Sequence, residues 1–333
     1  MRQWSTLLQA GISLVPALQM LQRSTSQPTL RGVLMQVCND VQAGQALHRA
    51  MQAHPDIFTP LHISLVQAGE SAGILDTMME RLSQTLDRNL ALQSRLRAAL
   101  IYPSTVIGIA VVVVVLMLVY IVPVFEEVFQ SLGAALPWST RMVLSLSRAL
   151  NLGGLWALLP VCGAALWLKR RGQDKAWLRQ WHRRLLGWPG LGVLMQMSLT
   201  ARWAQTLSAL LAAGVPLTDA LPVAGRATAH PIYERLSEHL QRRIAQGGLL
   251  SEGMAHSGRF PDLLVQLCAT GEASGTLETL LDKAAVLLGE AFDARVQALT
   301  TVLEPLIVVL LGGAIGVILV AMYLPIFRLG QAF

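Results

Sequence analysis

The chain repeats itself after about 202 residues, and this repetition restricts the fold to one that can be built twice. The segment GESAGILDTMMERL begins at Gly69, and GEASGTLETLLDKA begins at Gly271. Three further landmarks recur in the same order at nearly the same offset: LLQAGISLVPAL returns as LLAAGVPLTDAL, Tyr102–Pro103 as Glu304–Pro305, and VPVF as LPIF. The chain is therefore a tandem duplication, with units of about 120 residues that are too long for a short-period solenoid.

Each copy is predicted to be helical. From Leu75 onward, within the first repeated segment, apolar residues follow at spacings of three and four, which is one face of a helix, and they recur in the second copy from Leu277. Gly11 and its counterpart Gly214 are expected to end one helix and begin the next. We expect an all-α membrane protein with two homologous cytoplasmic helical bundles of about six helices each.

The composition is typical of a membrane protein. Hydrophobic residues make up 53% of the chain and charged residues 14%, against roughly 25% charged in average soluble domains. Residues 104–122 and 306–324 are nineteen-residue runs without a charge, long enough to cross the hydrocarbon core at about 1.5 Å per residue. Residues 152–168 form a third, shorter apolar run that contains Pro160, which a span tolerates. Three transmembrane helices are therefore predicted.

The distribution of basic residues predicts the orientation. A basic stretch follows the middle span directly and includes Lys169, Arg170, Arg171, Arg183 and Arg184. The positive-inside rule places residues 1–100 and 169–303 in the cytoplasm, with a periplasmic connector at 125–151 and a periplasmic tail at 325–333. No signal peptide is recognised. Because tryptophans are interleaved with the basic residues next to a span, the stretch is interpreted as an interfacial anchor and not as a nucleic-acid site.

No catalytic motif is found in the sequence. Nucleotide-binding glycine loops, zinc-binding histidine pairs and hydrolase nucleophile elbows are all missing. The cysteines at 38, 162 and 268 are isolated, which argues against a disulfide framework or a metal site. We therefore expect no enzymatic activity, no metal and no cofactor.

The GExxG motif is the first group of candidate site residues. It comprises Gly69, Glu70 and Gly73 in the first copy and Gly271, Glu272 and Gly275 in the second. One interpretation is a tight turn between helices in which the glutamate caps the next helix. The other is a surface that contacts a partner protein, and the sequence leaves both open.

The second group lies at the predicted membrane edges. It comprises Tyr102, Pro103, Pro123, Glu304, Pro305 and Pro325. Glu304 is interpreted either as a carboxylate at a helix N-terminus, stabilised by the free N–H groups there, or as a polar contact with a partner helix.

In this order and spacing, several segments resemble the PilC/GspF family of inner-membrane platform proteins of type IV pilus assembly and type II secretion. The most specific of them are GEASGTLETLLDKAA and AMYLPIF, supported by LLQAGISLVPAL, FTPLHISLVQAGESAGILD and AALIYPSTV. The resemblance covers nearly the whole chain. Family members carry several dozen residues before the LLQAG helix, where this chain has six.

The resemblance implies a multi-pass protein of the bacterial inner membrane with a cytoplasmic N-terminus and no catalytic activity. Its implied partners are a hexameric cytoplasmic ATPase, pilin or pseudopilin subunits, other inner-membrane assembly proteins and further copies of itself, with no nucleic acid. A pilus machine is slightly favoured over a secretion machine. The alternative function is a small transporter or channel component, which rests on the spans and Glu304 alone.

Overall fold

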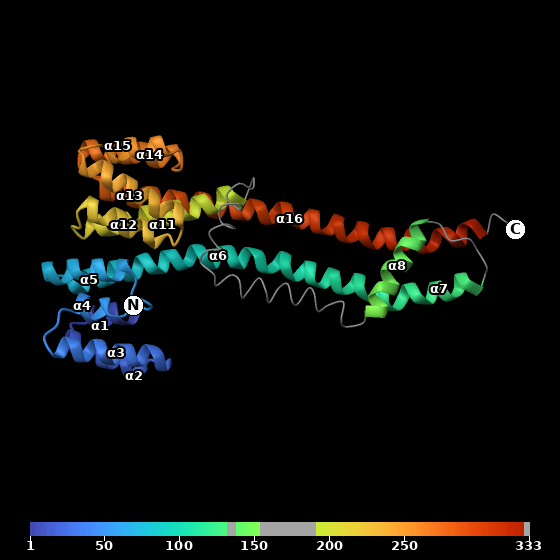
Figure 1. The fold of residues 1–333 in the computed structure, drawn as a ribbon, viewed down its shortest axis with the longest axis horizontal. Coiled ribbons are helices and arrows are strands. Elements are labelled where there is room, and N and C mark those ends of the chain that lie inside the picture. Colours follow the sequence, from blue (N-terminus) through green and yellow to red (C-terminus); the bar gives the residue numbers. More distant parts are fainter. Residues whose placement is uncertain (132–137, 154–190, 330–333) are drawn as a thin grey trace. The chain divides into compact units, whose positions relative to one another are not determined.

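The computed structural model describes residues 1–131, 138–153 and 191–329, and within these ranges the chain forms helices and no β-strand (Figure 1). The predicted all-α class is confirmed. The described chain divides into two units. Within the described ranges, unit one comprises residues 1–94 and 191–294, and unit two comprises residues 95–131, 138–153 and 295–329.

The duplication is visible in the helix order. The first copy contains α1 (Arg2–Gln9), α2 (Leu14–Ser24), α3 (Pro28–Gln42), α4 (Leu47–Gln52), α5 (Pro60–Ala72) and α6 (Leu75–Leu116). The second contains α11 (Leu191–Ala212), α12 (Leu217–Ala227), α13 (Pro231–Ala245), α14 (Leu250–Ser257), α15 (Asp262–Ser274) and α16 (Leu277–Leu329). Helices α2 to α6 begin 202 to 203 positions before α12 to α16. Each helix in one copy therefore has an equivalent in the other.

Both copies use the same local signals at their helix ends. Gly11 and Gly214 each have φ = +78°, a left-handed conformation that residues with a Cβ rarely adopt. They stand in the short connections from α1 to α2 and from α11 to α12, as the sequence predicts. A proline in the first turn fixes the start of α3, α5 and α13, because its missing N–H would have no partner there.

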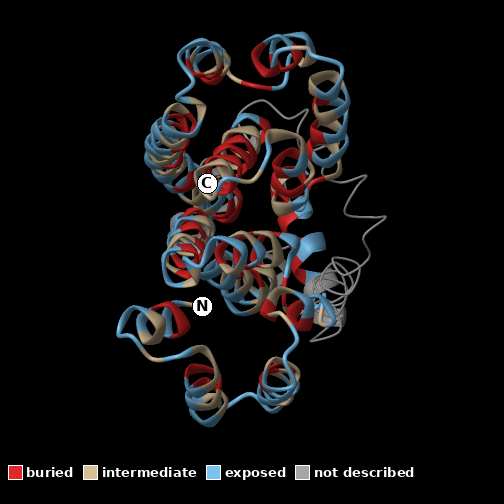
Figure 2. Ribbon diagram, turned by 90° about the vertical axis from the view of Figure 1, so that its left-hand side faces the viewer, coloured by how far each residue is buried: buried red, intermediate tan, exposed pale blue. Residues whose placement is uncertain are grey.

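The core of unit one is mostly apolar, and several of its buried polar groups are hydrogen-bonded within the chain. Leu18, Leu47 and Leu65 of the first copy are fully buried, and Figure 2 shows buried residues on the facing sides of the helices. In the second copy the buried Trp203 packs against Phe260 with the ring centroids 4.8 Å apart, and its indole N–H donates to Ser237 Oγ at 2.8 Å. The pairing of the indole N–H removes the cost of burying it without a partner.

In unit one, the two copies are packed head to tail. Helix α5 of the first copy packs against α12 and α11 of the second. In Figure 1, α2 and α3 lie at one edge of this unit and α14 and α15 at the opposite edge. The contact therefore joins two different faces of the repeated unit.

Unit two contains the apolar parts of α6 and α16, the π-helix η1 (Met117–Ile121), α7 (Val122–Ser131) and α8 (Trp138–Gly153). Leu118 and Val122 form a core with Leu144 and Met322, among others. Ser147 Oγ donates to the carbonyl of Leu118 at 2.6 Å, at the π-helix, where backbone carbonyls lose their regular partners.

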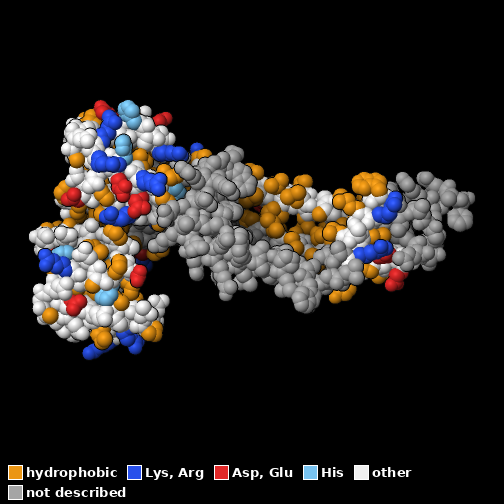
Figure 3. All heavy atoms as spheres, in the orientation of Figure 1, with side chains coloured by type: hydrophobic (Ala, Val, Ile, Leu, Met, Phe, Trp, Pro, Cys, Tyr) orange, Lys and Arg blue, Asp and Glu red, His pale blue; other side chains and the backbone are white. Residues whose placement is uncertain are grey.

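Two stretches of this unit have the length and apolarity of membrane spans, at Ile101–Glu127 and within Leu277–Tyr323. Only 17% and 22% of their most apolar windows are buried inside the chain. Figure 3 shows hydrophobic side chains gathered on unit two and charges of both signs on unit one. The exposed apolar surface is what a bilayer covers. Of the predicted span at 152–168, residues 154–168 lie outside the described ranges, as do Lys169, Arg170, Arg171, Arg183 and Arg184.

Candidate functional site: the GExxG turns and the cleft between the copies

Each glutamate of the GExxG motif binds the start of a short helix. Glu70 accepts the N–H groups of Leu47 at 2.6 Å and His48 at 3.0 Å, the first two residues of α4. Glu272 accepts those of Leu250 at 2.5 Å and Ser251 at 3.0 Å, at the start of α14. N–H groups in a first helical turn have no partner within their own helix, and a negative charge there is favourable.

This geometry differs in one respect from the structural interpretation of the sequence. The carboxylates bind the helix that precedes α5 or α15, whereas the sequence predicted a cap on the helix that follows. His48 adds a further contact in the first copy, with Nδ1 at 2.5 Å from Glu70 Oε2, where the second copy has Ser251. Sequence reasoning missed α4 and α14 as the capped helices because they lie more than twenty residues upstream.

The glycines of the motif meet two separate steric demands. Gly73 and Gly275 have φ = +71° and +73°, and they end α5 and α15 in the left-handed conformation. A Cβ added to Gly69 would lie 2.9 Å from Met78 Cβ, and one on Gly271 would lie 2.8 Å from Leu277 Cα. These first glycines therefore allow α5 and α15 to approach the next helix more closely than any other residue would.

The variable positions of the motif point outward. Ser71 and Ala72 are exposed, as are Ala273 and Ser274. The glutamates and the first glycines of both motifs, in contrast, make close contacts within the chain. A role in partner contact stays a prediction.

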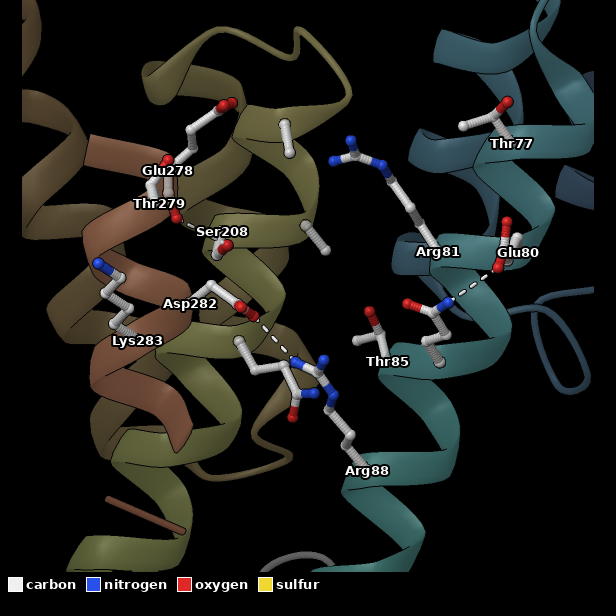
Figure 4. A pocket seen from close by; sticks show the side chains of 14 residues that line it. Thr77, Glu80, Arg81, Thr85, Arg88, Ser208, Glu278, Thr279, Asp282 and Lys283 are labelled. Atoms are coloured by element: carbon white, nitrogen blue, oxygen red, sulfur yellow. Dashed lines mark hydrogen bonds and ion pairs between the residues drawn. The ribbon is translucent and has the colours of Figure 1, made fainter. Parts of the chain in front are cut away.

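The helices that start at these turns line a polar cleft of about 550 Å³ between the two copies (Figure 4). The first turns of α6 form one wall, and α11 with the start of α16 forms the other. Equivalent positions of the two copies face this space, namely Thr77 and Thr279, Glu80 and Asp282, and Arg81 and Lys283. The cleft is thus built by the duplication.

One ion pair bridges the cleft. Arg88 Nη1 donates to Asp282 Oδ1 at 2.9 Å, with the two side chains 50% and 49% exposed. Water competes for such exposed groups, so the pair contributes about 0–1 kcal/mol. The lining has as many acidic as basic side chains, Glu80, Glu278 and Asp282 against Arg81, Arg88 and Lys283. Within the described ranges, no group of three or more potential metal ligands is found.

The residues at the membrane edge occupy helix interiors. Tyr102 and Pro103 lie inside α6, and Glu304 and Pro305 inside α16. The interpretation of Glu304 as a carboxylate at a helix N-terminus is therefore wrong, because α16 runs without a break from Leu277 to Leu329. Tyr102 Oη donates to Glu304 Oε1 at 3.4 Å, so equivalent positions of the two copies meet. Pro123 lies in α7 and Pro325 in the last turns of α16.

The family model for "Type II secretion system (T2SS), protein F" matches the chain twice, at residues 1–123 and 203–325. The chain belongs to this family. The two matches coincide with the two copies seen in the helix order, so the repeat found in the sequence is the family's own unit.

Curated relatives align along 99% of the chain. One is the type 4 fimbrial assembly protein PilC of Pseudomonas putida, 39% identical over 335 residues, which cover 82% of that protein. Another is the type IV pilus assembly protein TapC of Aeromonas hydrophila, 34% identical with 80% of its length covered. The type II secretion system protein F of Aeromonas hydrophila is 30% identical with 85% covered. The predicted resemblance to the PilC/GspF family is confirmed.

Proposed function

We propose that the protein is a non-enzymatic platform in a bacterial inner membrane, which couples a cytoplasmic assembly ATPase to the polymerisation of pilin or pseudopilin subunits. The observation that supports this best is the double match of the family model to the two copies. The relatives' names describe fimbrial or pilus assembly and type II secretion. The cleft adds no competing function, because its lining has equal numbers of acidic and basic residues and no catalytic grouping.

The identities favour the pilus machine. Relatives named for type IV pilus or fimbrial assembly are 32% to 39% identical, and those named for type II secretion are 28% to 30% identical. The expected partners are a hexameric ATPase, pilins, other inner-membrane assembly proteins and further copies of the chain. No nucleic acid or cofactor is expected.

The proposed topology has three spans and a cytoplasmic N-terminus. In this arrangement the helices of residues 1–100 and 169–303 form two cytoplasmic bundles of about six helices each. Residues 125–151 and 325–333 lie in the periplasm. The basic stretch after residue 168 supports this orientation, because such residues are retained on the cytoplasmic side.

Purification of the tagged full-length chain from native membranes tests the proposal. Co-purifying proteins are identified by mass spectrometry after mild cross-linking, with an unrelated tagged membrane protein as the control. An assembly ATPase together with pilin-like subunits is the expected result. If neither class is enriched over the control, and loss of the chain leaves fibre assembly and secretion intact, the platform function is excluded.

A further inference from the structure

The packing of α5 on α11 and α12 uses two faces that each occur twice in the chain. The face presented by α5 has an equivalent on α15, and the face presented by α11 and α12 has an equivalent on α1 and α2. In unit one, α15 packs on α14 and α2 packs on α1 and α3. The face on α15 and the face on α1 and α2 lie at opposite edges of this unit (Figure 1), so they do not make the contact that α5 makes with α11 and α12.

The face on α15 is more exposed than its equivalent. Leu61 of α5 is 3% exposed, whereas its counterpart Leu263 of α15 is 46% exposed. One turn further along, Leu65 is fully buried and Leu267 only partly so. The difference is confined to this side of the helix, because Cys268, which faces the interior of its own copy, is fully buried.

The face on α1 and α2 is also open. Val223 of α12 is 6% exposed, and its counterpart Met20 of α2 is 49% exposed. On α11, Gln205 is buried, and its counterpart Arg2 of α1 is exposed. Between α1 and α2 lies a groove of about 390 Å³, with Leu7 and Met20 among its lining residues.

We propose that α15 of one chain docks in the α1–α2 groove of a second copy of this chain, and thereby repeats between molecules the packing of α5 on α11 and α12 within one molecule. The occupant is argued from the duplication, since the groove and the helix descend from surfaces that already fit each other. A contact between different faces also leaves a free groove and a free α15 on the resulting pair. It therefore continues to further copies, as a ring or a row, instead of stopping at a dimer.

The charges of the free faces agree with such a contact. Asp262 begins α15, where α5 has Pro60, and it is exposed. The groove side carries the exposed Arg23, as well as Arg2, which forms an ion pair with Asp87 of the same chain at 2.9 Å. The free helix therefore has an acidic residue that the buried helix lacks, and Arg23 supplies a positive charge on the groove side. Opposite charges on the two faces favour their association and disfavour pairing of two identical faces.

Cysteine cross-linking between differently tagged chains tests the contact in native membranes. All chains in this experiment first have their three native cysteines removed, by Cys38→Ala, Cys162→Ala and Cys268→Ala. One chain carries Met20→Cys and the other Leu263→Cys, and a short bismaleimide is added. We expect a cross-linked pair carrying both tags in the mixed sample. Samples in which both chains carry only Met20→Cys, or only Leu263→Cys, should give at least tenfold less cross-linked product.

A positive control comes from the packing of α5 on α12 within one chain. Leu61→Cys with Val223→Cys in a single molecule should cross-link internally, which shows that the background is folded and that the reagent reaches such a pair. With that control positive, equal yields from mixed and single-site samples would mean that identical faces meet. No cross-link in the mixed sample would mean that α15 and the groove do not meet. Either result overturns the proposal.

A charge introduced on the free face supplies an independent readout. Leu263→Arg should reduce the apparent mass of the detergent-solubilised protein to that of a single chain, while the internal cross-link between positions 61 and 223 persists. Unchanged mass together with the internal cross-link would contradict the proposal. The inference does not depend on the proposed function, because neither measurement involves an ATPase or a pilin.

Discussion

At the scale of single residues, the carboxylates of Glu70 and Glu272 connect two helices that are distant in sequence. Each accepts two backbone N–H groups at 2.5–3.0 Å, and both side chains are partly buried. Replacing Glu272 by Ala leaves two N–H groups of α14 without partners, which costs about 1–3 kcal/mol. We expect the free energy of unfolding of the detergent-solubilised chain to fall by that amount in urea titrations.

Glu290→Ala is the matched control for this measurement. Glu290 is exposed, and its removal should change the free energy of unfolding by no more than about 0.5 kcal/mol. If Glu272→Ala were as mild as Glu290→Ala, the carboxylate would be free to serve a partner, and the contact interpretation of the motif would gain support.

His62 predicts a dependence of stability on pH. Burial lowers its pKa from 6.5 to about 4, and its Nδ1 accepts the N–H of Thr59 at 3.2 Å at the start of α5. Between pH 6.5 and 4 the unfolded chain binds a proton at this histidine and the folded chain does not. Stability is therefore complete above pH 6.5 and falls towards pH 4, by about 3 kcal/mol for this group.

Thermal unfolding of the wild type and of His62→Gln across this pH range measures the effect. Glutamine keeps a hydrogen-bond acceptor but does not titrate, so the loss of stability on acidification should be smaller in the variant. The second copy has the fully buried Leu264 at the equivalent position, which is a natural precedent for a non-titrating side chain. Parallel pH profiles for both proteins would assign the acid sensitivity to other groups.

At the scale of helices, the crossing of α15 and α16 depends on Gly271. A Cβ at this position would lie 2.8 Å from Leu277 Cα, and backbone cannot move aside as a flexible side chain can. Gly271→Ala should lower the free energy of unfolding by about 1–3 kcal/mol. Gly32→Ala is the control, because Gly32 lies inside α3 with open space around it, and alanine should raise stability there by about 0.5–1 kcal/mol. Equal effects of the two changes would contradict the close approach.

Much of this local structure could be predicted from the sequence, because its causes are local. The helical period and the glycine turns at Gly11 and Gly214 depend on neighbouring residues. The partners of Glu70 and Glu304 could not be predicted in this way, because they lie far from these residues in the sequence. Glu70 binds α4, which lies outside any local window, and the continuity of α16 through Glu304 and Pro305 overrides the usual effect of proline as a helix breaker.

The head-to-tail packing of the copies was likewise out of reach of the sequence. A repeat specifies that two similar bundles exist, but either like or unlike faces can meet. Leu61 and Leu263 are the same residue type at equivalent positions, and only the tertiary structure buries the first and leaves the second exposed.

At the scale of the whole molecule, the number of spans determines on which side the C-terminus lies. Three spans place the two ends on opposite sides of the membrane, and two place them on the same side. We expect an alkaline phosphatase fused after Phe333 to be active in the periplasm and one fused after Ser94 to be inactive. Green fluorescent protein at the same positions should give the opposite pattern. An inactive phosphatase at both positions would indicate two spans.

Helices α6 and α16 each continue from unit one into unit two without a break at the boundary. Along such a continuous helix, the number of residues determines the direction in which each later side chain points. Inserting a single residue near Ser94 would turn everything beyond it by about 100° and advance it by about 1.5 Å, while four residues would return it to within about 40°. An insertion in one of the two helices would therefore change which side chains lie on a given face of its apolar segment, while the other helix keeps its own pattern.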